Sequence, residues 1–142
     1  MNKSKYIYSL IIIISISNAS AQEIEFIDFI RFLSENAHSN EEIKKLFSLD
    51  YIEDILYRND PNNIELEIDL IYNILEYLAF EGTVNKSTNE NIQNNFPDVR
   101  LKAVILLGQL NIIKARNAII EVLKYENNPF IINEANKILN KN

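Results

Sequence analysis

Apolar residues recur every three or four positions along most of this chain, which is the spacing of one face of an α-helix. Two glycines and three prolines in 142 residues leave little turn chemistry for a β fold. We therefore predict an all-α protein. The apolar spacing predicts six helices, at about 23–36, 41–58, 64–80, 97–109, 113–125 and 129–140, with a break in the second near 48–50.

The ends of these helices carry recognisable signals. Pro61 ends the second helix, because the residue before a proline avoids helical geometry. Pro97 and Pro129 fall in the first turns of the fourth and sixth helices, where proline is favoured. Gly82 is a plausible C-terminal cap, and we expect Gly108 to permit a tight exit from its helix. Residues 83–95 are polar and rich in asparagine, so we expect a loop there.

The chain also repeats itself. Pro97 and Pro129 are 32 residues apart, and so are Ala103 and Ala135. A second match aligns residues 52–61 with residues 120–129, although the unit after Pro61 holds one long helix where a pair would be expected. A fixed period of this length is typical of a solenoid built from helix pairs.

Residues 96–139, the clearest repeat, resemble a HEAT repeat of the short PBS-lyase-like type. The resemblance implies a short α-solenoid of antiparallel helix pairs that binds protein partners, usually on the concave face formed by the second helix of each pair. It does not imply an enzyme. Within it we expect Arg100 and Asp98 to bridge neighbouring turns or repeats. The positions that carry the resemblance are Pro97, Asp98, Val99, Arg100, Ala103, Leu107, Gly108, Ala118, Ile119, Leu123, Asn128 and Pro129.

Residues 1–21 have the pattern of a secretory signal peptide. Lys3 and Lys5 precede an apolar run from Tyr6 to Ile16, and 19–21 (Ala-Ser-Ala) supplies small residues for cleavage before Gln22. The run is shorter than the roughly 20 residues needed to span a bilayer, so cleavage is favoured over an uncleaved anchor. We expect an exported protein, periplasmic or extracellular, whose residues 22–142 form one helical domain with no further membrane span. With no cysteine it has no disulfide, so apolar packing must stabilise it.

Charge is unevenly distributed. The net charge is −6, but residues 22–81 hold 15 acidic and 4 basic residues, whereas residues 82–142 hold 5 acidic and 8 basic. The acidic total argues against nucleic-acid binding, which depends on neutralising phosphates. Lys114, Arg116 and Lys124 lie on the second helix of the clearest repeat, so they form either a partner-binding strip or an ordinary solvated face.

No pattern of residues indicates catalysis or cofactor binding. His38 is the sole histidine and lies in a predicted turn, where a solvated role is expected. Acidic pairs such as Glu65 and Asp69 share a helix face. Carboxylates act as acid and base only when they are buried around a substrate, so we expect these to form a solvated surface. Zinc would need histidine or cysteine ligands, and a phosphate loop would need more glycines. We expect no catalytic residue, no metal and no cofactor.

Three functions remain open on these grounds. The first is a non-enzymatic, protein-binding adaptor or scaffold that acts after export. The alternative is a structural envelope protein that self-associates through its C-terminal helix, since Phe130, Ile131, Ile132, Ile138 and Leu139 leave no obvious polar cap. An enzyme or a small-ligand binder is the remote third possibility.

Overall fold

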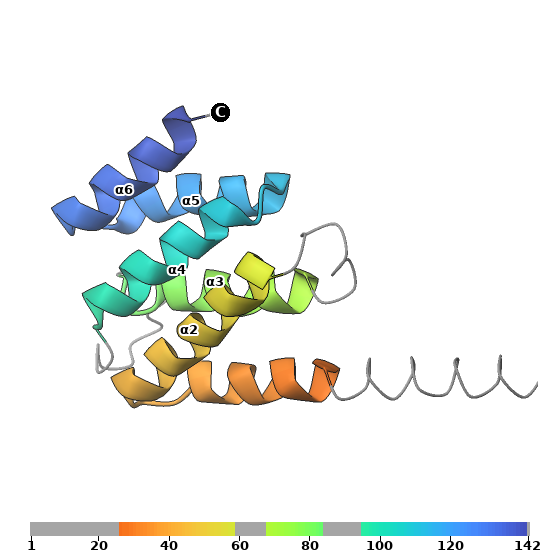
Figure 1. Ribbon diagram of the computed structural model, residues 1–142. Helices are drawn as coiled ribbons and strands as arrows, with labels where there is room; N and C mark the ends of the chain where they lie inside the picture. Colours follow the sequence, from red (N-terminus) through yellow and green to blue (C-terminus); the bar gives the residue numbers. More distant parts are fainter. Residues whose placement is uncertain (1–25, 59–67, 84–94, 142) are drawn as a thin grey trace, which may run out of the picture.

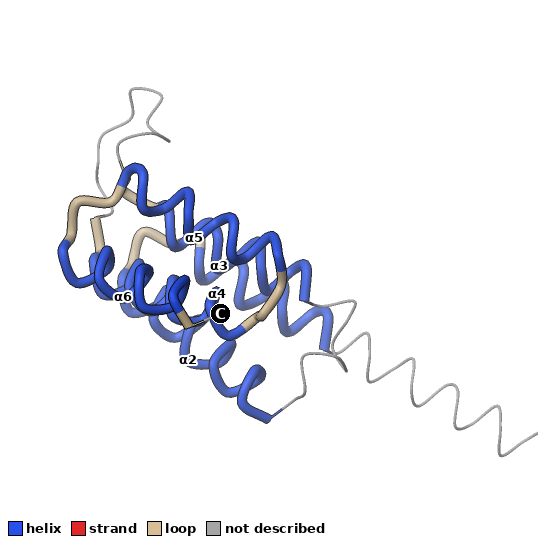
Figure 2. The backbone as a smooth tube through the Cα atoms, turned by 90° about the horizontal axis from the view of Figure 1, so that it is seen from above, coloured by secondary structure: helices blue, strands red, loops and turns tan. Residues whose placement is uncertain are grey.

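The computed structural model describes residues 26–58, 68–83 and 95–141, and throughout these ranges the regular structure is helical, with no strand. The prediction of an all-α fold is confirmed. Figure 1 shows the arrangement, and Figure 2 gives the view from above. The helices are residues 26–37, α2 (Glu42–Arg58), α3 (Ile68–Phe80), α4 (Pro97–Gln109), α5 (Ile113–Tyr125) and α6 (Pro129–Asn140).

The helices form two layers. In one layer α2 packs on α4 and α4 packs on α6; in the other α3 packs on α5. The helix of residues 26–37 belongs to the same layer as α3 and α5, below α3 in the view of Figure 1. Each helix from α2 to α5 also contacts the next one along the chain, so the path crosses between the layers at every connection. A chain that alternates in this way buries one continuous seam of side chains between its layers.

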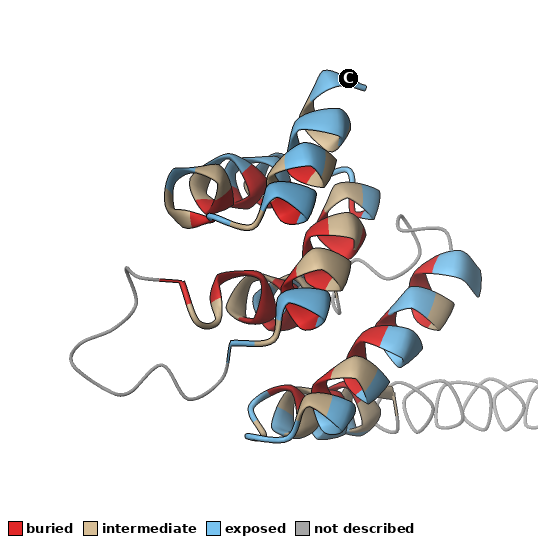
Figure 3. Ribbon diagram, turned by 90° about the vertical axis from the view of Figure 1, so that its left-hand side faces the viewer, coloured by how far each residue is buried: buried red, intermediate tan, exposed pale blue. Residues whose placement is uncertain are grey.

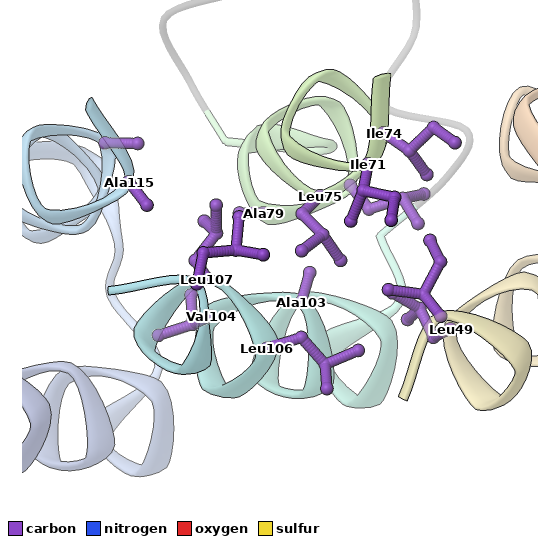
Figure 4. Packing of buried hydrophobic residues seen from close by; sticks show 14 of the residues in the cluster. Leu49, Ile71, Ile74, Leu75, Ala79, Ala103, Val104, Leu106, Leu107 and Ala115 are labelled. Atoms are coloured by element: carbon purple, nitrogen blue, oxygen red, sulfur yellow. The ribbon is translucent and has the colours of Figure 1, made fainter. Parts of the chain in front are cut away.

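That seam is the hydrophobic core. Buried residues face the interior between the layers (Figure 3), and in the close view of Figure 4 Leu75 of α3 lies over Ala103 of α4. Ala103 and Ala135 have no exposed surface, and Ala118 is also buried. These small side chains allow neighbouring helices to approach closely.

The helix ends agree closely with the sequence pattern. The predicted bounds 97–109, 113–125 and 129–140 are those of α4, α5 and α6. Gly82 adopts a φ of 76°, the left-handed geometry of a helix cap. The predicted start of α3 at 64, residues 84–94 of the predicted loop and the predicted leader 1–21 lie outside the described residues.

Two expectations about local structure are wrong. Helix α2 runs unbroken through Ser48, whose side chain is fully buried; its one hydroxyl hydrogen is within reach of the carbonyl oxygens of Leu33 (2.8 Å from Oγ) and Lys44 (3.2 Å). A serine whose hydroxyl donor is satisfied in this way does not interrupt the helix. Gly108 lies within α4 and does not form its exit; the left-handed residue is Asn111, with a φ of 51°.

The role of Gly108 is close packing. A Cβ atom placed on it would meet Cγ2 of Ile138 in α6 at 2.7 Å. Glycine at this position therefore permits α4 and α6 to lie side by side.

The layers also revise the internal repeat. Helices α4 and α6, which begin at the two prolines 32 residues apart, are neighbours in one layer. The second match aligned the end of α2 with the end of α5, yet α2 packs with α4 whereas α5 packs with α3 in the other layer. That match therefore does not relate equivalent helices.

Candidate binding surfaces

The three predicted partner-binding residues point in different directions on α5. Lys114 pairs with Asp69 of α3, and its Nζ lies 4.5 Å from the centre of the Tyr72 ring. Arg116 instead donates from Nη2 to the carbonyl oxygen of Leu139 in α6, at 3.2 Å. Lys124 pairs with Glu121 one turn earlier on α5, at 2.5 Å.

Helix geometry explains this divergence. Successive residues of an α-helix are turned by about 100°, so side chains two positions apart, such as Lys114 and Arg116, lie on nearly opposite sides. Lys114 therefore faces α3 and Arg116 faces α6. The structure does not bring the three cations together into one strip, and their binding of a partner remains a prediction.

Arg116 lies at the edge of a cleft of about 480 Å³. The cleft is formed where α4 ends and α5 begins, against the last turns of α6. Helix α5 starts here without a side-chain cap, because its N-cap residue is Ile112. The lining is Leu107, Gly108, Asn111, Ile112, Ile113, Arg116, Ile119, Ile138 and Leu139.

A second surface lies on the first two helices, and sequence reasoning missed it. Four aromatic rings form a closed cluster, which we call the aromatic surface: Phe29 and Phe32 of residues 26–37, with Phe47 and Tyr51 of α2. The ring centres of Phe47 and Tyr51 are 4.6 Å apart, and those of Phe29 and Tyr51 are 5.5 Å apart. Phe32, Phe47 and Tyr51 are each 40–47% exposed.

The aromatic surface is on the outer side of α2. Phe47 and Tyr51 are four residues apart, and Ile43, which is exposed, lies one turn before them. This stripe is turned roughly 140° from the buried side of the helix, which includes Leu49 and Ile52. The spacing of Ile43, Phe47 and Tyr51 was visible in the sequence as a second apolar stripe, which is the signal that could have revealed the surface.

Polar groups inside the fold are held by structural ion pairs. Nζ of the fully buried Lys45 lies 2.6 Å from Oε1 of Glu81 and 3.0 Å from the carbonyl oxygen of Ala37. Burial, together with the neighbouring Glu81 carboxylate, raises the pKa of Tyr77. His38 is exposed in a turn, as expected, and its ring stacks on Tyr77 with centres 4.0 Å apart.

A second buried pair links two connections of the chain. Nε of Arg100 lies 2.8 Å from Oε2 of Glu126, and both side chains are buried. Oε1 of Glu126 also accepts bonds from the backbone N–H groups of Asn127 and Asn128, and Nη1 of Arg100 reaches Oδ1 of Asn95 at 2.5 Å. Arg100 bridges as expected, since it joins the start of α4 to the connection between α5 and α6. The exposed Asp98 has no such contact among the described residues.

The described residues show neither a candidate metal site nor a membrane-spanning helix. They contain no group of three or more metal-ligating side chains. None of their helices has the length and apolarity to cross a bilayer. A scan against family models, a search of curated proteins and a search of solved structures each found no match to this chain.

Proposed function

We propose that this protein is an exported, non-enzymatic adaptor of the HEAT-repeat type, which binds another protein through its aromatic surface. The observation that carries the proposal is the exposed cluster of Phe32, Phe47 and Tyr51. Aromatic side chains dominate the binding energy of protein interfaces, and a contiguous apolar patch on a water-soluble domain marks an interaction site. The spacing of 32 residues and the alternating layers support the solenoid part of the proposal.

The charge around the aromatic surface indicates the partner's chemistry. Residues 26–58 carry seven acidic and four basic side chains, and one of the basic four, Lys45, is buried against Glu81. Two of the carboxylates, Asp50 and Glu53, pair with Lys102 of α4. The surplus of negative charge favours a partner that presents an apolar anchor flanked by lysine or arginine.

The test is crosslinking of the tagged protein in its own cell envelope, followed by mass spectrometry and binding of the purified candidate partner. The double variant Phe47→Ser/Tyr51→Ser deletes two rings of the aromatic surface. Because both side chains are partly exposed, the fold should persist. Tyr57→Ser is the matched control, because Tyr57 is on the same helix and 89% exposed but outside the cluster.

We expect one dominant partner, bound by the wild type and by Tyr57→Ser. The double variant Phe47→Ser/Tyr51→Ser should bind this partner at least about thirtyfold more weakly. Equal binding by the double variant and the control would refute this assignment. Capture of the protein's own copies alone would favour the self-associating envelope protein, and N-terminal sequencing of the captured chain would test cleavage before Gln22.

A further inference from the structure

The cleft between α4, α5 and α6 has a composition unlike that of the aromatic surface. Its walls are aliphatic, and its volume of about 480 Å³ lies within the range of small-molecule sites, roughly 300–1,000 Å³. The polar side chains in its lining are Arg116 and Asn111. A cleft whose side chains are mostly aliphatic, with one cation at its edge, suits a ligand that has an apolar body and one negative group.

Arg116 is available for such a group. Among the described residues its hydrogen bond goes from Nη2 to the Leu139 carbonyl oxygen, at 3.2 Å. A guanidinium carries five N–H donors, so this bond anchors the side chain at the end of α6 and leaves donors for a carboxylate. The neighbouring Ile113, which is 82% exposed, gives the cleft an apolar edge beside the cation.

The lining separates two sources of a carboxylate. A peptide bound by its C-terminus would bring one N–H and one C=O group for every residue, and each of these needs a partner when it leaves water. Asn111 and Arg116 are the two polar side chains of the lining, too few to meet that need for a peptide of several residues. An alkyl chain makes no such demand and gains free energy with every CH₂ group that it buries.

We propose that this cleft binds a fatty acid, with the carboxylate on Arg116 and the alkyl chain along the aliphatic wall of α5 and α6. This site is separate from the aromatic surface, so either proposal can fail while the other stands. A protein-binding adaptor with such a site would sense or carry a lipid-derived acid.

The test is calorimetric titration of the intact protein with the saturated series from octanoate to dodecanoate, each kept below its micelle concentration. Affinity should rise about fourfold for each added CH₂ until the cleft is filled. Arg116→Gln should weaken dodecanoate binding about tenfold. Lys114→Gln is the matched control, because it removes the same charge from the opposite side of α5 and should leave the affinity unchanged.

Two further measurements keep the proposal open to refutation. Ile113→Glu places a like charge at the exposed edge of the cleft and should abolish dodecanoate binding without disturbing the fold, as circular dichroism can verify. Equal effects of Arg116→Gln and Lys114→Gln, loss of binding only in Phe47→Ser/Tyr51→Ser, or no binding at all would each overturn the assignment. Tighter binding of acetyl-trileucine with a free C-terminus would overturn it in favour of a peptide.

Discussion

At the scale of single residues, the buried pair of Arg100 and Glu126 is the most consequential contact in the clearest repeat. Glu126→Gln keeps the shape of the side chain but leaves the Arg100 charge uncompensated inside the fold. We expect a loss of about 3 kcal/mol in the free energy of unfolding, near the lower bound for breaking a buried pair, because Asn95 still accepts a bond from Arg100. Urea denaturation measures it. The double variant Arg100→Met/Glu126→Gln should be more stable than Glu126→Gln. If its loss equalled the sum of the losses of Arg100→Met and Glu126→Gln, the pairing would be contradicted.

The same residue makes stability depend on pH. Burial alone would raise the pKa of Glu126, but the hydrogen bonds from Arg100 and from the backbone N–H groups of Asn128 and Asn127 outweigh it and hold the pKa below its ordinary value of 4.5. A lowered pKa stabilises the fold above 4.5, and this contribution is lost as the pH falls through the folded-state pKa. The stability difference between wild type and Glu126→Gln should therefore be constant near neutral pH and shrink below 4.5. A difference that grows on acidification would contradict this account.

Gly108 gives a prediction whose sign the structure decides. In an isolated helix, Gly108→Ala would stabilise by up to about 1 kcal/mol. Here the new methyl group would meet Ile138 at 2.7 Å, and overpacking costs about 1–3 kcal/mol, so we expect a net loss of about 1 kcal/mol. Thermal unfolding of Gly108→Ala alone and in an Ile138→Ala background separates the two effects. The substitution should stabilise the second background, and destabilisation in both would show that Ile138 is not the cause.

At the scale of elements, helix position was predictable and helix function was not. Pro97 and Pro129 mark helix starts through a local rule, which is why the bounds of α4 and α6 could be predicted. The roles of Ser48 and Gly108 depend on partners in other helices, Leu33 and Ile138, which no local pattern specifies. The opposite directions of Lys114 and Arg116 follow from helix geometry alone and could have been deduced from the sequence.

Helix α6 shows how a single cap contributes. The Asn128 side chain accepts a hydrogen bond from the backbone N–H of Phe130 at 2.9 Å, whereas α4 and α5 start without a side-chain cap. Asn128→Ala should lower the free energy of unfolding by about 1 kcal/mol, and Asn128→Ser, which can still cap, should restore most of it. Equal losses in the two variants, measured by urea denaturation, would locate the effect in packing.

At the scale of the whole molecule, the two ends of the layered stack differ in chemistry. The first two helices present the aromatic surface, whereas the exposed side of α6 is mostly polar. Ile131 is buried, and Ile132, Ile138 and Leu139 are half-buried, so Phe130 is the large apolar side chain that α6 leaves exposed. The exposed residues of α6 otherwise include Asn133, Asn136, Lys137 and Asn140. The exposed face of α6 is therefore mostly polar, and its apolar residues other than Phe130 are at least half-buried.

Unlike ends have a consequence for assembly. Head-to-tail stacking would set an aromatic face against asparagine side chains, and pairing of two aromatic surfaces would bring together two helix pairs of net charge −3 each. We therefore expect a monomer mass by light scattering at low salt, independent of protein concentration. Phe130→Ser should leave that mass unchanged. Concentration-dependent growth that Phe130→Ser abolishes would contradict the expectation and would favour the envelope protein that stacks through its C-terminal helix.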